Sequence, residues 1–451
     1  MPAIRRLSRY DLHCLAVETR ARPIHMGILA VVDGGPLLDP AGELRLAAVR
    51  SEIGGRLADV PQLRRVVFRP GPLAGRPLWV DDPAFRVDHH VGEVRLSAPG
   101  DQAALLALTE QLMARPLDRS RPLWRMWFVT GLEAGRVGIL VLLHHALADG
   151  VGAMRMVRAL LEPPMLPDIL PPRDAPVAPP AWRALVRDNL RADMATLRWL
   201  GRPATWQRVA EVARSAWHVN AVARRVPRTS LNAPVGPRRR LATLDLDLAC
   251  ARRVARAHGC SVNDVVLSVV AGGVRALLLG RGEPIERLRP RAGVAVALFS
   301  HEHGRAGNDI GTLHVPLPLA DPVPGARLRS IAAATARAKR SPMVAAEPIL
   351  RASLGRFGAF RRSLDHQRLI NLAETYLPGP PARIDVLGAP VLELLPIAPL
   401  AGNLGLSFVA LSYAGRLGLT VRVDADQFPD LDVLMAAMQR DCRLLAPDPP
   451  G

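Results

Sequence analysis

The sequence predicts an α/β protein with two mixed sheets, each flanked by helices. In both halves of the 451-residue chain, apolar runs of strand length alternate with amphipathic stretches of helical period. Between the halves, residues 162–180 contain eight prolines, which exclude a continuous helix or a central strand. We therefore expect an N-terminal domain at 1–165, a proline-rich linker with amphipathic helices at 166–232, and a C-terminal domain at 233–451.

The N-terminal domain shows this alternation clearly. Residues 25–33 (HMGILAVVD), 124–129 (WRMWFV) and 137–143 (VGILVLL) have the apolar character of buried strands. Residues 38–57 and 102–113 are expected to form helices, the second with leucines at helical spacing. A mixed sheet covered by helices follows from this order.

The third of these strands leads into the most unusual pattern of the chain. His144 and His145 follow it directly, and Asp149 and Gly150 precede the next helical stretch. Buried imidazoles must be hydrogen-bonded or face a cleft, because an unpaired polar ring in an apolar interior is costly. Gly150 would let the backbone pass close to a ligand.

Three interpretations of this HHxxxDG pattern compete. An imidazole near its unperturbed pKa is suited to remove a proton from a hydroxyl or thiol. His and Asp side chains are also metal ligands, but the HExxH spacing is absent and adjacent histidines on an extended chain point to opposite faces. A single histidine after a strand is usually a core residue. The complete pattern at a strand–helix junction favours the general base, and we expect no metal.

The segment after the prolines, residues 181–226, combines helical period with positive charge. One apolar stripe consists of Val186, Leu190, Met194 and Leu197. Arginines run beside it, at Arg187, Arg191, Arg198 and Arg202. Such a helix fits a membrane surface or the surface of its own protein with a solvated arginine edge. We favour slightly the second arrangement.

The C-terminal domain repeats the alternation. Its expected helices are residues 265–279 and 430–445. Its expected strands are residues 241–248, 294–298, 312–317, 404–412 and 417–423.

Composition limits the classes of binding partner and the cellular compartment that we expect. The net charge of +18 comes almost entirely from arginine and favours an anionic ligand or membrane surface. No zinc-finger spacing, aromatic RNA-binding motif or basic tail supports nucleic acid. The four scattered cysteines indicate a reducing cytoplasm. We see no signal peptide and no run of 18 apolar residues, and we expect a soluble or peripheral protein.

Several motifs resemble one family. HHALADG at 144–150 is similar to the HHxxxDG motif of CoA-dependent acyltransferases, which include chloramphenicol acetyltransferase and nonribosomal peptide condensation domains. Residues 115–124 (RPLDRSRPLW) and 261–266 (SVNDVV) resemble motifs of the bacterial wax ester synthase/diacylglycerol acyltransferase family within that superfamily. Further similar segments follow in the family's order at 23–27, 230–236, 378–380 and 411–417.

This resemblance implies a fold and an activity. The fold would be two chloramphenicol-acetyltransferase-like domains with a channel between them and the motif loop at its middle. The activity would be O-acyl transfer from a long-chain acyl-CoA, as substrate and without a cofactor, to diacylglycerol, giving triacylglycerol, or to a fatty alcohol, giving a wax ester. It also implies a cytoplasmic protein, with peripheral attachment to the inner membrane or lipid droplets as an option.

The resemblance also suggests residue roles within the HHxxxDG motif. His145, its second histidine, would take the proton of the alcohol and then protonate the leaving thiolate. His144 and Asp149 would support the loop. No covalent acyl-enzyme is needed, which agrees with the absence of a GxSxG nucleophile motif.

For the other two motifs we favour structural roles. Pro122, Leu123 and Trp124 fit a proline that enters a strand, followed by two core residues. Asn263 fits the N-cap of a helix, and Asp264 fits the positive end of that helix's dipole. Any functional use of these residues is what the family suggests.

The C-terminal half departs from the family pattern. Ala297 and Phe299 stand where a Val-Ser-x-Arg-like segment has serine and arginine. Asp309 replaces the arginine of a Gly-Asn-Arg pattern, and Tyr376 replaces an asparagine before the Pro-Gly-Pro turn.

These departures affect the motif aspartate and keep two alternatives open. Asp149 would need another partner, for which Arg291 and Arg305 are candidates. The first alternative is a weakly active or inactive paralogue that binds lipid or acyl-CoA. The second is an acyltransferase with a different hydroxyl acceptor.

Overall fold

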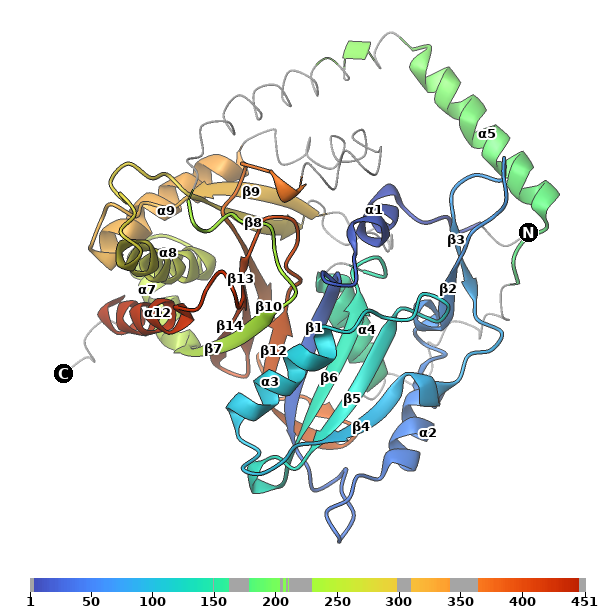
Figure 1. Cartoon of the computed structure of the whole chain (residues 1–451), viewed down its shortest axis with the longest axis horizontal. Coiled ribbons are helices and arrows are strands. Elements are labelled where there is room, and N and C mark those ends of the chain that lie inside the picture. Colours follow the sequence, from blue (N-terminus) through green and yellow to red (C-terminus); the bar gives the residue numbers. More distant parts are fainter. Residues whose placement is uncertain are drawn as a thin grey trace.

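The protein contains two six-stranded mixed sheets, each covered by helices, as Figure 1 shows. The computed structural model describes residues 4–148, 150–161, 178–202, 206–207, 210, 229–297, 310–340 and 364–445. The predicted fold class, mixed sheets flanked by helices, is confirmed.

The first sheet has the order β11-β12-β1-β6-β5-β4. Its strands are β1 (His25–Asp33), β4 (Val91–Arg95), β5 (Trp124–Thr130), β6 (Arg136–His144), β11 (Asp385–Val386) and β12 (Ala389–Ile397). β1 pairs with β6 along its whole length, so that His25 lies opposite His144. β11 and β12 come from the C-terminal half of the chain, so the sheets do not follow the expected cut between domains. The expected boundaries stay a prediction.

Side-chain alternation divides the first sheet into two faces. α2 (Leu46–Arg56) and α4 (Gly150–Leu161) pack on the face that carries Ile28 and Val141. α3 (Gln102–Met113) packs on the other face, with Leu29 and Leu140. α2 begins later than expected because residues 34–45 form turns and a short bridge.

The second sheet has the order β7-β14-β13-β10-β8-β9. Its strands are β7 (Arg239–Asp247), β8 (Arg291–Ala297), β9 (Ile310–Pro316), β10 (Leu372–Pro378), β13 (Leu406–Tyr413) and β14 (Arg416–Asp424). The helices that pack against it are α7 (Leu248–Ala257), α8 (Val262–Gly280), α9 (Pro324–Lys339) and α12 (Leu431–Leu445). Figure 1 shows these helices together on the outer side of the sheet.

α8 is the central helix of this layer. It is apolar around its whole circumference and long enough to span a membrane, yet 72% of its most apolar window is buried inside the protein. Gly272 and Gly273 let α12 approach closely, at Asp441 and Met438. Asp441 forms a buried ion pair with Arg327 of α9, which ties the three helices together.

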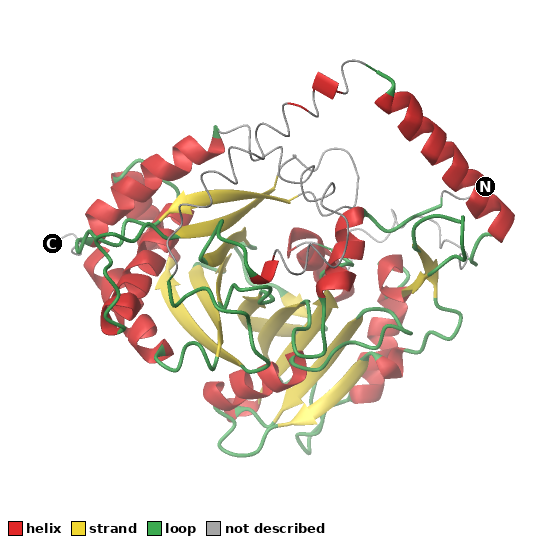
Figure 2. Cartoon of the chain, turned by 45° about the horizontal axis from the view of Figure 1, so that its top comes forward, coloured by secondary structure: helices red, strands yellow, loops and turns green. Residues whose placement is uncertain are grey.

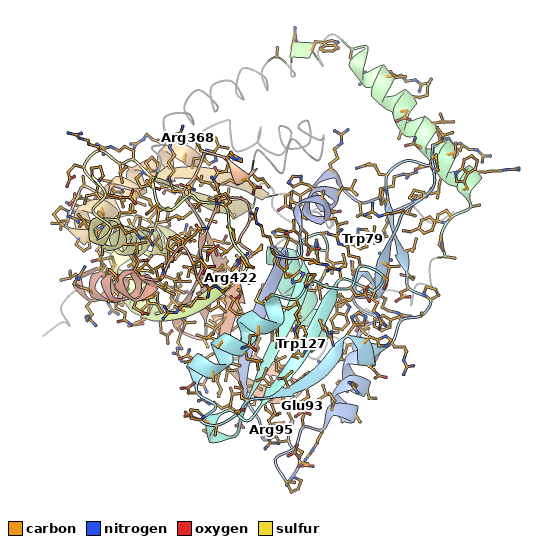
Figure 3. All side chains as sticks on the ribbon, viewed as in Figure 1. Trp79, Glu93, Arg95, Trp127, Arg368 and Arg422 are labelled. Carbon is orange, nitrogen blue, oxygen red and sulfur yellow. The ribbon has the colours of Figure 1, made fainter. Side chains whose placement is uncertain are left out.

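The two sheets meet at a buried ion pair. Arg422 of β14 donates from Nε and Nη2 to the two carboxylate oxygens of Glu110 in α3, at 2.9 Å each. Nη1 of Arg422 also donates to the carbonyl of Ala398, just past β12. Arg422 lies between the two halves in Figure 3. Such a bidentate pair fixes both the distance and the orientation of its partners.

The remaining elements surround the first sheet. They are α1 (Arg9–Val17), β2 (Arg65–Phe68), β3 (Leu78–Asp81), α5 (Trp182–Leu200) and the single turns Pro61–Arg64, Val87–His89 and Glu133–Gly135. In Figure 2, α5 projects at the edge of the molecule, away from the two six-stranded sheets, and its first half packs on β3. Leu190, Met194 and Leu197 on it are exposed, whereas Val186 packs beside Leu185 against β3, so the prediction that its apolar stripe packs on its own protein is confirmed only at Val186.

Candidate functional site

The backbone of both motif histidines is held by neighbouring segments. The N–H of His144, the last residue of β6, donates to the carbonyl of Leu123 at 3.0 Å. The N–H of His145 donates to the carbonyl of Ile24 at 3.0 Å. The N–H of Leu147 then returns to the carbonyl of His144 at 2.9 Å and closes a turn. The strand end and the turn therefore present the two rings in fixed directions.

The His144 ring is fully buried and committed to the protein. Its Nδ1 accepts the N–H of Ala146 at 3.0 Å. Its Nε2 lies 3.4 Å from Oε1 of Glu18. Because Nδ1 accepts a hydrogen bond, the ring proton resides on Nε2 and faces the carboxylate.

Glu18 is the centre of a buried polar cluster. The same Oε1 lies 3.3 Å from Nε2 of His25 and accepts the N–H of Ile24 at 3.3 Å. Oε2 accepts Nη2 of Arg119 at 2.7 Å. Burial by itself raises the pKa of Glu18, but the adjacent imidazoles of His144 and His25 and the hydrogen bond from Arg119 hold that pKa well below its usual range. Glu18 is therefore a carboxylate at neutral pH.

His25 shares this carboxylate with His144. The two rings stand opposite each other across β1 and β6, with centroids 6.0 Å apart. Burial lowers the pKa of His25, and the nearby Glu18 offsets only part of that shift. His25 is therefore neutral at pH 7. The carboxylate of Glu18 is the shared neighbour of both imidazoles.

Whereas His144 is fully buried, His145, the residue after β6, is half-buried. Its ring contacts Tyr10 of α1 edge-to-face, with centroids 5.6 Å apart. A capping box between Ser8 and Asp11 fixes the start of α1, so the tyrosine is well positioned. Leu377 of β10 lies beside Gly150, where α4 begins, and brings the second sheet to the motif. Asp149 lies outside the described residues.

The segment Pro122-Leu123-Trp124 packs beside the end of β6 and supports the position of His144. Leu123 and Trp124 are buried, and the carbonyl of Leu123 is the acceptor for His144. Trp124 donates from Nε1 to the carbonyl of Leu63 at 2.6 Å, and its ring stacks on His90. Pro122 precedes β5, as a strand-entering proline should. All of these are hydrogen bonds or packing contacts within the protein.

The motif pair Asn263 and Asp264 lies at the start of α8. The N-cap is Ser261, whose side chain forms a capping box with Asp264, so the expectation that Asn263 is the cap is wrong. Asn263 instead donates from Nδ2 to Oε2 of Glu374 at 3.3 Å. Glu374 is 1% exposed in β10, and burial raises its pKa to about 8. A neutral carboxylic acid therefore stands in the second sheet at pH 7.

The positions that depart from the family pattern are only partly described. Tyr376 donates to Oγ of Ser412 at 3.3 Å and packs against the hydrophobic core between the second sheet and its helices. Ala297 is the last residue of β8, and Arg291 the first. Phe299, Arg305 and Asp309 lie outside the described residues.

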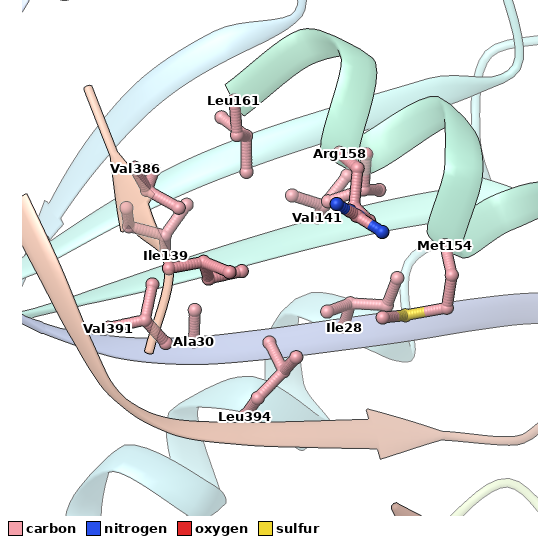
Figure 4. Close-up of a pocket in the computed structure, with 12 residues that line it drawn as sticks. Ile28, Ala30, Ile139, Val141, Met154, Arg158, Leu161, Val386, Val391 and Leu394 are labelled. Carbon is pink, nitrogen blue, oxygen red and sulfur yellow. The ribbon is translucent and has the colours of Figure 1, made fainter. Parts of the chain in front are cut away.

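A narrow apolar pocket lies between α4 and the first sheet (Figure 4). Ile28 and Ala30 of β1 and Ile139 and Val141 of β6 form its floor. Met154 of α4 lines it, and so do residues of β11 and β12. Since α4 begins at Gly150, the pocket and the HHxxxDG motif share one helix.

Sequence reasoning missed four residues of these two polar clusters. Glu18, His25 and Arg119 surround His144, and Glu374 pairs with Asn263. His25 and Arg119 lie inside segments that the sequence singled out, 23–27 and 115–124, so their polar side chains were a usable signal. Glu18 and Glu374 carry no local signal, because only long-range packing buries them.

Comparisons with known proteins agree with this architecture. Residues 7–266 match the family "wax ester synthase/diacylglycerol acyltransferase catalytic domain", and residues 306–446 match its C-terminal domain. A probable diacylglycerol O-acyltransferase of Mycobacterium tuberculosis is 29% identical over 453 residues, 96% of this chain and 94% of that protein. A putative diacylglycerol O-acyltransferase of the same species is 36% identical over 301 residues, 62% of this chain and 61% of that protein.

Solved structures show the same fold. The wax ester synthase/diacylglycerol acyltransferase of Marinobacter aquaeolei VT8 superposes with a TM-score of 0.71 at 22% identity and covers 98% of both chains. The first condensation domain of the CDA synthetase superposes with a TM-score of 0.61 at 18% identity, over 100% of this chain and 98% of that one. Because the catalytic-domain match spans more than half of the sequence, the chain belongs to the wax ester synthase/diacylglycerol acyltransferase family and is an acyl-CoA-dependent O-acyltransferase.

Proposed function

We propose that this enzyme transfers a long-chain acyl group from acyl-CoA to diacylglycerol, or to a long-chain alcohol, with His145 as the general base. The observation that carries this assignment is the commitment of His144. Its Nδ1 is occupied by the Ala146 N–H and its Nε2 faces Glu18. Of the two motif imidazoles, His144 is fully buried and His145 is the one with exposed surface that a substrate can approach.

The proposed reaction balances with two substrates and one histidine. His145 removes the proton of the acceptor hydroxyl while the oxygen attacks the thioester carbonyl. The tetrahedral intermediate collapses, the carbon–sulfur bond breaks, and the imidazolium returns the proton to the CoA thiolate. The products are the ester and free CoA, and the reaction requires neither a metal nor a cofactor. Asp149 and His144 shape the loop and transfer no proton.

We propose that the acyl chain enters beneath α4, where the pocket is narrower than an alkyl chain and the helix must move away from the sheet to admit it. The pocket's floor of aliphatic side chains offers an alkyl tail the apolar surroundings it needs. Because α4 starts at the motif, a chain that enters along this helix would leave its thioester near His145. The arginine-rich surface is suited to the phosphates of CoA.

We place the enzyme in the cytoplasm, peripheral to the inner membrane or to lipid droplets. Both acceptor classes are insoluble in water and dissolve in lipid. An enzyme that takes them must meet a lipid surface.

Acyl transfer by the purified protein tests this proposal. Palmitoyl-CoA is supplied with either a diacylglycerol or hexadecanol, beside a His145→Ala variant. We expect ester product that falls by ~10²–10⁴-fold in the variant, which is the usual contribution of a general base. Equal product in both proteins would contradict the role of His145. Bound palmitoyl-CoA without turnover in either protein would identify a binding protein instead.

A further inference from the structure

The first half of α5 is fixed to the N-terminal domain by its inward face. Leu185 is buried in a cluster with Leu78 and Val80 of β3. Nε of Arg6 forms an ion pair with Asp188 at 2.9 Å, and Nη2 donates to the carbonyl of Leu185 at 3.1 Å. The rotation of α5 about its axis is therefore defined, and its other face points in a known direction.

That other face carries a continuous apolar stripe. Leu190, Met194 and Leu197 are 58%, 52% and 63% exposed, and Trp182 at the start of the helix is 52% exposed. The spacing of Leu190, Met194 and Leu197, four and three residues, places these three side chains on one side of the helix. Figures 1 and 2 both show α5 at the rim of the molecule.

A neighbouring loop extends the stripe. Leu73 is 74% exposed and is held at φ 68°, a conformation that leucine rarely adopts. Nδ2 of Asn189 in α5 donates to its carbonyl at 3.3 Å, so the loop and the helix move together. An exposed leucine held at unfavourable φ offers an apolar side chain to an outside partner.

The stripe has a basic border on one side. Arg183, Arg187, Arg191 and Arg198 recur along the helix and are all exposed. On the opposite border Asp193 accepts a hydrogen bond from Asn189. An apolar stripe with a row of arginines matches the acyl region and phosphate layer of an anionic membrane.

The geometry points to α5 and the Leu73 loop as the surface by which this enzyme docks on anionic phospholipid. The apolar stripe enters the outer acyl region, and the arginine row contacts the phosphates. The inference deepens the proposed peripheral location by naming the surface and the lipid charge. It rests on the proposed function only for the choice of a lipid partner.

Vesicle flotation tests this surface. The full-length protein is mixed with vesicles of phosphatidylcholine alone or with phosphatidylglycerol. The stripe variant is Leu190→Ser/Met194→Ser/Leu197→Ser, which changes only exposed side chains. The control is Val433→Ser/Leu444→Ser on α12, which are 46% and 63% exposed. We expect wild type and control to float with anionic vesicles, and the stripe variant to bind at least about tenfold more weakly.

Three outcomes would overturn the inference. They are no flotation of wild type, equal flotation of wild type and stripe variant, and a dimer that only the stripe variant loses, which would assign the stripe to a second copy. Arg187→Glu/Arg191→Glu should reduce binding to anionic vesicles, and unchanged binding would contradict the charge requirement. His145→Ala should float like wild type, so a failure of the catalytic proposal is distinguishable from a failure of the docking surface.

Discussion

Replacing Glu374 by Gln should stabilise the protein at neutral pH. In the folded state burial raises the pKa of Glu374 to about 8, while an unfolded chain has the ordinary value of 4.5. Folding at pH 7 must therefore protonate this carboxyl group. From pH 4.5 to 7 the cost accumulates at about 1.4 kcal/mol per pH unit, so that on the order of 3 kcal/mol is lost at pH 7.

The sign of this effect follows from the raised pKa. The stability contribution of the protonated group is fully present below pH 4.5 and is lost as the pH rises through about 8. Gln is neutral at every pH and keeps an oxygen for the Asn263 amide. Oε1 of Glu374 and Oδ1 of Asn263 are buried and lack a partner among the described residues. The amide nitrogen of Gln is a hydrogen-bond donor from which Oδ1 of Asn263 can accept, and the protonated acid of Glu374 offers a donor in the same way.

Urea unfolding at a series of pH values measures the prediction. The free energies of unfolding of wild type and Glu374→Gln should differ by less than about 1 kcal/mol at pH 5 and by about 3 kcal/mol at pH 7, in favour of the variant. Glu43→Gln is the control, because Glu43 is exposed and its removal should give no such pH-dependent gain. A difference between wild type and Glu374→Gln that is constant with pH would refute the reasoning.

Three further predictions address the site and the junction. Glu18→Gln should lower the free energy of unfolding by about 1–3 kcal/mol and reduce turnover, because two imidazoles and Arg119 lose a charged acceptor; unchanged turnover would contradict its positioning role. Glu110→Ala should cost about 3–5 kcal/mol, because Arg422 is left buried and unpaired; urea unfolding should show that Glu110→Ala/Arg422→Met recovers much of it. Ala30→Phe should fill the pocket under α4 and lower kcat/KM for palmitoyl-CoA relative to octanoyl-CoA by at least about tenfold; an unchanged ratio would place the acyl chain elsewhere.

Local patterns predicted the central strands of the first sheet but missed β10 in the middle of the second sheet, and they gave no sign of long-range pairing. The apolar runs that became β1, β5 and β6 are visible in the sequence because both faces of these strands are buried. Nothing local indicates that β12 leaves its own half of the chain and pairs with β1. The expected helix at 38–57 was too long for a similar reason, since turn contacts within residues 34–45 decide where α2 begins.

Only the part of the site that depends on a local pattern was predicted. The motif located His144 and His145, because a histidine pair after a buried strand is unusual in any context. Their unequal environments depend on Glu18, which belongs to the end of α1 and becomes a partner only when that helix folds over the sheet. The exposure of the stripe on α5 also escaped prediction, because an amphipathic pattern is the same whether its partner is protein or lipid.

The histidine doublet itself follows from strand geometry. Successive residues of an extended chain point to opposite faces, so His144 turns toward the α3 face while the half-buried His145 turns away from it. The first ring is pinned by the Ala146 amide and the Glu18 carboxylate, and the backbone of the second by Ile24. Pinning the first ring fixes the exit of β6 and therefore the position of the second. In the mechanism we propose, one imidazole holds the loop and its neighbour accepts the proton, so replacing His144 should lower turnover through displacement of His145.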